Sequence, residues 1–389
     1  MELIHKVHLY HHILLLLLLA LLTISCGQVS TQIQPKQALP THSASPLSLR
    51  SLAQAHGIYI GTSVVVDALQ NEGQYRETLA NEFNLVTPEV SMKFDATEPK
   101  RNLYTFEGGD TLVAFAKMHN MQVRGHNLVW YTALPSWLTT GTFSREELIT
   151  ILREHIVTEV SHYRGQVNIW DVVNEAVNND GTLRNSIWLR GIGPDYLDLA
   201  FLWAHEANPE ARLFYNDYDG EGLGQKSNAI YNLVKGMIQR GVPINGVGLE
   251  MHVSLDEYPH PEDVLANMQR LAALGLEVQI TEMDVKIQND TRPLQARLTA
   301  QAQIYRDMLS VCLAIKRCTA FIMWGFTDRH SWIPDATGHQ DAPLIFDEEY
   351  RPKPAFFALV DVLNKLSNEN NVNKFYRAGL ANTVLLLPS

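Results

Sequence analysis

A regular alternation of strand-like runs with amphipathic segments is the feature that most constrains how this chain folds. One amphipathic segment, 294–314, spaces Leu298, Tyr305 and Leu309 at a helical period, and another covers 148–163. Eight strand-like runs with helices between them predict a single (β/α)8 TIM barrel, whose active site lies at the carboxyl ends of the strands. The strand-like runs cover residues 58–65, 85–90, 122–130, 167–173, 213–216, 247–252, 277–283 and 321–326.

The main alternative fold is an open, doubly wound sheet. A sheet of that kind that binds a dinucleotide carries a Gly-rich turn after its first strand, but the sequence there reads Ile60-Gly61-Thr62-Ser63, without the G-x-G-x-x-G pattern. Composition excludes other classes, because 46% hydrophobic and 19% charged residues are typical of a globular protein. A net charge of −11 without a basic stripe argues against nucleic-acid binding, and we interpret the acidic excess as a contribution to solubility.

Residues 1–26 are predicted to be a signal peptide of the lipoprotein type. An almost pure leucine run at 13–22 is too short to span a bilayer comfortably and is typical of a signal-peptide core. Ser25-Cys26-Gly27 follows directly and resembles a bacterial lipoprotein processing site, which predicts lipidation of Cys26 and anchoring to a membrane in the cell envelope. Plain secretion with cleavage nearby is the alternative. Residues 27–48, rich in Ser, Thr, Gln and Pro, are predicted to be a flexible linker.

The remaining chain divides into a predicted catalytic domain, 49–365, and a C-terminal tail of unknown role, 366–389. Two cysteines, Cys312 and Cys318, lie close together near the end of the predicted domain. In an exported chain, two thiols at such spacing suggest one local disulfide. The alternative is a pair of buried free thiols at the end of a helix.

Two glutamates, Glu175 and Glu282, each end a different strand-like run. A glycosidase needs one carboxyl group that gives a proton to the leaving oxygen and one carboxylate that attacks or stabilises the sugar carbon. A single glutamate at such a position is usually a solvated or ion-paired residue, but other polar and aromatic residues gather at the same predicted strand ends. These residues are Glu89, Lys93, His126, Trp130, Asn174, Glu250, His252, Asp284, Trp324 and Trp332. Amides and charged groups bind sugar hydroxyls and indoles stack on sugar rings, so the set predicts a carbohydrate site.

These motifs, from about residue 52 to 363, resemble glycoside hydrolase family 10, the endo-β-1,4-xylanases. The resemblance rests on several motifs in order. They are Ser-Met-Lys at 91–93, His-Asn-Leu-Val-Trp at 126–130, Leu-Pro-Ser-Trp at 134–137, Trp-Asp-Val-Val-Asn-Glu-Ala at 170–176, Phe-Tyr-Asn-Asp-Tyr at 214–218, Ile-Thr-Glu-Met-Asp at 280–284, Trp-Gly-Phe-Thr-Asp-Arg-His-Ser-Trp at 324–332 and Pro-Leu-Ile-Phe-Asp at 343–347. The spacing of the two cysteines also matches a disulfide that is common in that family.

The resemblance implies a role for each matching residue. Glu175 corresponds to the acid/base and Glu282 to the nucleophile of a retaining mechanism, in which the two carboxyl groups lie about 5–5.5 Å apart. Asn174 corresponds to the residue that binds the hydroxyl beside the reacting carbon, His252 to the histidine that hydrogen-bonds the nucleophile, and Asp284 to the carboxylate that orients this histidine. The matching sugar contacts are Glu89, Lys93, His126, Trp130, Trp324 and Trp332. No metal and no cofactor is expected.

Five positions depart from the usual family sequence. Val90 replaces Asn, Ala133 replaces Gln, Tyr131 replaces His, and Glu250-Met251 replaces Gln-Ser. We expect Val90 and Ala133 each to remove a hydrogen-bonding group from the sugar two sites before the cleaved bond. Glu250 adds a third carboxyl group, and if it lies near Glu282 the two share a proton and the pH profile moves.

The sequence is therefore interpreted as an exported, monomeric, retaining endo-β-1,4-xylanase that acts on plant cell-wall xylan. One alternative is a related β-glycanase that acts on β-glucan or a modified xylan. Another is a surface glycan-binding lipoprotein with a weak or inactive site, although the presence of both glutamates and of His252 argues against it. A phosphate-handling barrel isomerase fits poorly, because no Gly-rich phosphate loop lies near the last strand.

Overall fold

The computed structural model describes residues 48–365. The predicted signal peptide, the lipidation site at Cys26 and the C-terminal tail lie outside the described residues, as does the predicted linker except for its last residue, Ser48. The Ser48 side chain accepts a hydrogen bond from the backbone N–H of Ser51 and so caps the first described helix.

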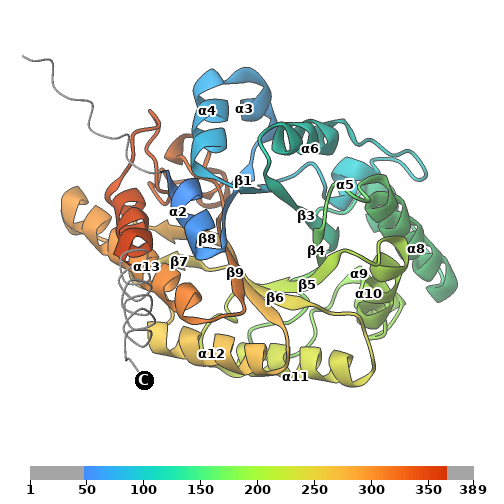
Figure 1. Ribbon diagram of the computed structural model, residues 1–389. Helices are drawn as coiled ribbons and strands as arrows, with labels where there is room; N and C mark the ends of the chain where they lie inside the picture. The colour runs from blue at the N-terminus through green and yellow to red at the C-terminus, as the bar shows by residue number, and fades with distance from the viewer. Residues whose placement is uncertain (1–47, 366–389) are drawn as a thin grey trace, which may run out of the picture. The chain divides into compact units, whose positions relative to one another are not determined.

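Eight parallel strands form a closed barrel, as predicted (Figure 1). The barrel closes at two places: β1 pairs with β9, for example Gly61 with Ile322, and β6 pairs with β8, for example Gly248 with Gln279. The barrel strands are β1 (Tyr59–Val64), β2 (Leu85–Pro88), β3 (Gln122–Val129), β4 (Ile169–Asn174), β5 (Arg212–Asp217), β6 (Gly246–Leu249), β8 (Glu277–Lys286) and β9 (Cys318–Met323).

A ninth strand, β7 (His252–Ser254), departs from the sequence prediction, which placed one continuous strand over 247–252. Met251 has a left-handed backbone with φ 65°, so the run breaks after β6 and resumes at His252. The backbone N–H of Met251 donates to the Glu221 carboxylate at 2.9 Å, which satisfies a donor that the broken ladder leaves without a partner. The short β7 pairs only with β8, where His252 lies opposite Asp284. The break therefore places His252 beside the strand that carries Glu282.

Helices surround the barrel (Figure 1). The longer ones follow strands as the helical period predicted, and α8 begins with a capping box in which Ser144 and Glu147 exchange hydrogen bonds. Within the described part of the chain, no helix has the length and apolar character to cross a membrane. The helices are α2 (Leu49–His56), α3 (Val66–Asn71), α4 (Gly73–Glu82), α5 (Phe94–Thr97), α6 (Glu107–Met118), α7 (Ser136–Thr139), α8 (Arg145–His162), α9 (Ile187–Gly191), α10 (Tyr196–Ala207), α11 (Gln225–Gln239), α12 (Pro261–Ala273), α13 (Leu294–Ala314), η1 (Asp328–His330) and α14 (Ile333–Thr337), and residues 354–365 are also helical.

A disulfide joins the C-terminal part of α13 to the first residue of β9. The sulfur atoms of Cys312 and Cys318 lie 2.02 Å apart. The cross-link fixes the short connection through which the chain enters the last barrel strand.

A buried arginine lies inside the barrel beneath the strand ends. Arg124 on β3 donates from Nε to Asp171 on β4 at 2.9 Å and from Nη1 to Gln279 on β8 at 2.5 Å, and its guanidinium lies 4.8 Å from the centre of the Phe214 ring. Asp171 also contacts His126 Nδ1, at 3.0 Å. Since an arginine is charged at any pH that a protein meets, it holds Asp171 ionised. Asp171 in turn orients His126 at the floor of the site.

Candidate active site

A cleft of about 1080 Å³ opens at the carboxyl ends of the barrel strands. It brings together all but one of the site residues predicted from the sequence. Asp284 is the exception, because it is fully buried behind His252. The predicted residues that line the cleft are Glu89, Lys93, His126, Trp130, Asn174, Glu175, Glu250, His252, Glu282, Trp324 and Trp332.

Glu175 follows the last residue of β4 and has a left-handed backbone with φ 54°. Its backbone N–H donates to the Asn216 carbonyl at 2.8 Å, so the neighbouring strand β5 holds this conformation. The side chain is 8% exposed, and Asn174 Nδ2 donates to its Oε1 at 3.1 Å. Burial, together with the negative charges of Glu282 and Asp217, raises the pKa of Glu175 to about 7. The carboxyl group therefore keeps its proton up to near neutrality, as a general acid must.

Glu282 lies within β8, at the level where the barrel opens into the cleft. Its Oε1 accepts a hydrogen bond from Asn216 Nδ2 at 2.7 Å, and His252 Nε2 lies 3.3 Å from its Oε2. Burial opposes ionisation, but electrostatic interactions with His126 and His252, together with the hydrogen bond of His252, lower the pKa of Glu282 below its usual range. Glu282 is therefore an anion near neutrality, while Glu175 is an acid.

His252 is held from behind by two groups. Its Nδ1 lies 2.8 Å from Asp284 Oδ2, and the Trp332 indole Nε1 donates to the same oxygen at 2.8 Å. Burial disfavours the charged ring, but the charge and hydrogen bond of Asp284, with a further contribution from Glu282, raise the pKa of His252 to about 10. Trp332 therefore acts on the site both as a cleft wall and as the donor that fixes Asp284.

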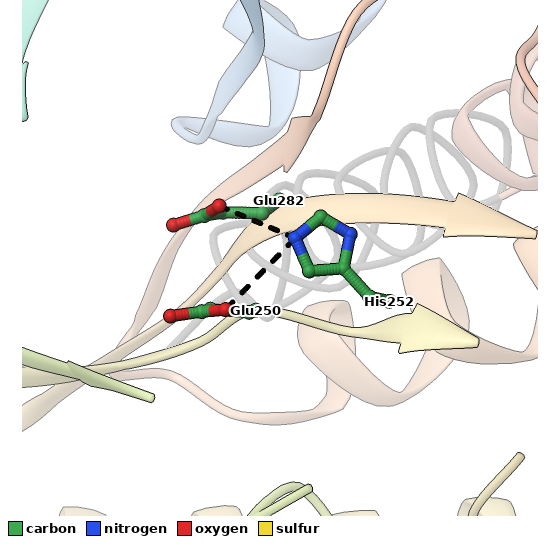
Figure 2. A group of neighbouring side chains, drawn as sticks. All are labelled: Glu250, His252 and Glu282. Atoms are coloured by element: carbon green, nitrogen blue, oxygen red, sulfur yellow. Dashed lines mark hydrogen bonds and ion pairs between the residues drawn. The ribbon is translucent and has the colours of Figure 1, made fainter. Parts of the chain in front are cut away.

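Glu250 follows the last residue of β6 and is 1% exposed. Its Oε1 accepts from Asn216 Nδ2 at 3.0 Å, and its Oε2 lies 3.9 Å from His252 Nε2 (Figure 2). Burial and then the charges of Glu282 and Glu175 raise the pKa of Glu250 well above its usual range. The structure thus places this third carboxyl group beside Glu282, and the amide of Asn216 contacts both.

The role of Asn216 was missed from the sequence. Its Nδ2 lies 2.8 Å from Asn174 Oδ1 in addition to its contacts with Glu250 and Glu282, and its Oδ1 accepts from Thr281 Oγ1 at 2.7 Å. Its position at the end of a strand-like run was the available signal. Further lining residues lie in loops that carry no regular pattern; they are Tyr131, Asn179, Tyr218, Asp219, Leu223, Asp256 and Tyr258. Lys286, the last residue of β8, also lines the cleft.

One end of the cleft combines a cation with aromatic rings. Lys93 Nζ lies 4.8 Å from the Trp130 ring centre and 5.9 Å from that of Trp324. Burial raises the pKa of the nearby Glu89 to about 7, although the charge of Lys93 opposes this shift. A cation, a carboxyl group and two indoles around one space can bind a sugar ring by its hydroxyls and by its faces.

Val90 and Ala133, the two replacements expected to affect the same sugar, differ in whether they line the cleft. Val90 lines the cleft and is 57% exposed. Ala133 is not among the cleft-lining residues; it has φ 49°, and its carbonyl accepts from the Asp95 backbone N–H at 3.0 Å. Only Val90 therefore bears directly on the cleft surface.

Comparison with known proteins decides the family. The model of glycosyl hydrolase family 10 matches residues 48–362. The chain belongs to glycosyl hydrolase family 10. Among related family 10 proteins, endo-1,4-beta-xylanase B of Thermotoga neapolitana is 43% identical over 327 residues, which cover 82% of this chain and 93% of that protein. An endo-1,4-beta-xylanase of Agaricus bisporus is 39% identical over 306 residues, which cover 78% of this chain and 90% of that protein.

Solved structures agree with this assignment. Native xylanase 10B from Thermotoga maritima superposes with a TM-score of 0.80 at 42% identity and covers 83% of this chain and 99% of its own. Xylanase 10B from Thermotoga petrophila RKU-1, in complex with xylobiose, gives 0.81 at 42% identity and covers 84% of this chain and 99% of its own. The resemblance that the motifs predicted is confirmed, and so is the barrel.

Proposed function

We propose that this family 10 enzyme hydrolyses internal β-1,4-xylosidic bonds of xylan with retention of configuration. The observation that carries the proposal is the opposite shift of two pKa values in one cleft: that of Glu175 is raised to about 7, and that of Glu282 is lowered. Two titratable groups separated in this way divide the roles of acid and nucleophile. The xylanase names of relatives at 43% and 39% identity, and the xylobiose in the related Thermotoga petrophila structure, support xylan as the substrate.

In the first step, Glu282 attacks the anomeric carbon while Glu175 gives its proton to the departing glycosidic oxygen. A covalent glycosyl-enzyme forms and the aglycone leaves as an alcohol. His252 and Asn216, at 3.3 and 2.7 Å from the Glu282 carboxylate, hold it in position for attack. Asn174, whose amide is fixed between Glu175 and Asn216, is placed to bind the hydroxyl beside the reacting carbon.

In the second step, Glu175, now ionised, takes a proton from water, and the oxygen of that water attacks the anomeric carbon. The bond to Glu282 breaks, the sugar leaves with its original configuration, and Glu175 is again protonated. The expected separation of about 5–5.5 Å between the two carboxyl groups stays a prediction.

The test is hydrolysis of a panel of β-glycans, in which the rate is measured by the release of reducing ends. Proton NMR identifies the anomer that forms first. We expect xylan to be cleaved faster than mixed-linkage β-glucan, with the β-anomer appearing first. Faster cleavage of glucan would favour the second candidate, a β-glycanase with altered specificity, to which exposed Val90 points. Sugar binding without turnover would favour a glycan-binding protein.

We also propose that the enzyme is exported and anchored through a lipid on Cys26. Support comes from the leucine run at 13–22 and the Ser25-Cys26-Gly27 segment. Full-length protein expressed in a bacterium should partition into detergent, and the Cys26→Ser variant should be released to the aqueous fraction. A soluble wild-type protein whose N-terminus lies downstream of Cys26 would contradict the anchor and leave plain secretion.

A further inference from the structure

Three side chains at the floor of the cleft converge on one point. Glu250, His252 and Glu282 each offer one ligand atom, and these atoms all lie within 4.8 Å of one another (Figure 2). We propose that these three residues form a binding site for a borderline divalent cation such as Zn²⁺, and that the bound ion reversibly inhibits the enzyme. The inhibition, though not the binding, rests on the proposed role of Glu282 as nucleophile.

The histidine is oriented as a metal ligand is. A histidine that binds a metal through one ring nitrogen usually donates the other N–H to a carboxylate, which fixes the tautomer and the ring direction. His252 has this arrangement: Nδ1 lies 2.8 Å from Asp284 Oδ2, which Trp332 Nε1 also contacts at 2.8 Å. With the Nδ1 proton held by Asp284, Nε2 is the nitrogen left to face Glu282 and Glu250.

The distances suit a small cation. Ligand atoms at about 2.0–2.2 Å from a tetrahedral zinc lie roughly 3.3–3.6 Å from each other. His252 Nε2 lies 3.3 Å from Glu282 Oε2 and 3.9 Å from Glu250 Oε2, and the three ligand atoms lie within 4.8 Å of one another. The His252–Glu282 pair already has the spacing of zinc ligands, and Glu250 has to move toward it. Three protein ligands leave the fourth position of the ion to water from the cleft, which these residues line.

Glu250 is what makes the set a metal site. Its side chain is 1% exposed, Asn216 holds Oε1 at 3.0 Å, and Oε2 turns toward His252. The usual family residue at this position, glutamine, has no charge to offset that of a cation. When Glu250 and Glu282 are both ionised, their two negative charges balance the charge of one divalent ion. The attraction between the ion and the carboxylates then offsets the desolvation cost of burying each carboxylate. The site is therefore expected in this chain and not in relatives that carry glutamine here.

The ligand set selects the class of ion. An imidazole nitrogen with two carboxylates suits Zn²⁺, Co²⁺, Ni²⁺ and Cu²⁺, whereas Mg²⁺ and Ca²⁺ prefer oxygen ligands alone. When the ion enters, two protons leave to solvent: the one between His252 Nε2 and Glu282 Oε2, and the one that the buried Glu250 carboxyl group holds. The oxygen of Glu282 that then binds the ion cannot attack a sugar carbon, so turnover stops until the ion leaves.

Binding is tested with Co²⁺, whose visible absorption reports nitrogen and oxygen coordination without any assay of activity. Wild-type enzyme should develop the bands at one equivalent, and Zn²⁺ should abolish them by displacement. Glu250→Gln keeps the size of the side chain and the oxygen that faces Asn216, and it should weaken Co²⁺ binding by roughly 10- to 100-fold or more. Glu89→Gln, the matched control, removes a cleft carboxyl group outside the proposed ligand set and should weaken binding much less.

Equal Co²⁺ binding by wild type and Glu250→Gln would overturn the site, provided that thermal melting shows both folded. Equal weakening in Glu89→Gln would overturn it too, because the effect would then come from general charge. For each variant, inhibition is measured as the ratio of its rate with Zn²⁺ to its rate without Zn²⁺. We expect inhibition of wild type that EDTA reverses, and inhibition by Ca²⁺ as strong as that by Zn²⁺ would exclude His252 as a ligand. Co²⁺ binding at this site in an enzyme that does not cleave xylan would contradict the proposed function and leave the site intact.

Discussion

The buried carboxyl groups of two regions of the molecule differ in what surrounds them. At the strand ends, Glu175 and Glu282 face one cleft and their pKa values move in opposite directions. On the buried face of helix α8, Glu159 is fully buried, with His155 Nε2 3.4 Å from its Oε2 and no hydrogen bond to either carboxyl oxygen within the described structure. Burial raises the pKa of Glu159 well above its usual range and lowers that of His155 to about 3, so both are neutral. Shifts that leave both groups neutral therefore indicate burial alone, whereas two carboxyl groups whose pKa values move apart in one open cleft indicate an acid and a nucleophile.

The largest expected effect of a substitution on activity is at Glu282, and it tests whether the two regions differ in function. Removal of the nucleophile by Glu282→Ala should lower kcat/KM on xylan by roughly 10⁴-fold or more, because the covalent intermediate no longer forms. Azide should partly restore turnover on an activated xyloside and give a glycosyl azide of inverted configuration. The matched change on the buried face of α8, Glu159→Gln, should leave kcat/KM within about twofold of wild type, since this residue touches no substrate. Equal losses in the two variants would mean that the contrast between the regions is wrong.

The next effect separates the acid from the nucleophile. Glu175→Ala should lower kcat/KM on xylan by about 10²- to 10⁴-fold, which is the usual contribution of general acid catalysis. On an aryl xylobioside with a dinitrophenolate leaving group, which needs no proton, formation of the intermediate should be nearly normal. Azide should here give the retained product. The ratio of rates on the two substrates is the measurement, and an unchanged ratio would remove Glu175 from the role of acid.

The pH profile follows from the same pair. The acid must be protonated, and because the pKa of Glu175 is raised to about 7, kcat/KM should fall as pH rises through about 7. The nucleophile must be ionised, and because the pKa of Glu282 is lowered, the acid limb should lie below the ordinary glutamate range. Substrate occupancy shifts such values in kcat, so kcat/KM is the quantity to follow. Glu159→Gln should leave both limbs in place, and a displaced limb would show that Glu159 acts on the cleft.

A smaller effect, on stability and not on rate, belongs to Glu159. A group whose folded-state pKa is raised stabilises the fold fully below its unfolded pKa and loses that contribution as pH rises toward the folded value. Wild type should therefore lose stability above about pH 4.5 relative to Glu159→Gln, by about 1–3 kcal/mol between pH 4.5 and 7. Urea unfolding at both pH values gives the difference. Glu210→Gln, on the exposed surface, is the control. Its free energy of unfolding should differ from that of wild type by the same amount at both pH values.

The fold and most of the site could be predicted from the sequence because both follow from regular patterns. Parallel strands in a barrel bring their carboxyl ends together, so strand-end residues such as Glu175 and Glu282 must meet. The break at Met251 could not be predicted, since a left-handed residue in an apolar run leaves no mark on hydrophobic periodicity. Glu159 and His155 are one helical turn apart on α8 and contact each other. The helical period of the sequence predicted that this face is buried, but it did not predict the contact. The contacts of Asn216 with four side chains depend on distances across the barrel that the sequence order does not give.

The smallest expected effect on activity is at Val90, which lines the cleft, and it is compared with the effect at Ala133, which does not. A remote hydrogen bond that strengthens in the transition state raises kcat/KM, and the valine removes one that the family usually provides. Val90 is 57% exposed and lines the cleft, so Val90→Asn should raise kcat/KM on xylo-oligosaccharides by about fivefold, as a hydrogen bond worth about 1 kcal/mol gives. Ala133→Gln should give no gain, because Ala133 is not among the lining residues and its left-handed turn is held by Asp95. A gain from Ala133→Gln equal to that of Val90→Asn would restore the sequence-based view that both positions face the same sugar. A loss from Val90→Asn, with a gain on substituted xylan for wild type, would mean that the apolar surface at this end of the cleft binds a less polar sugar unit.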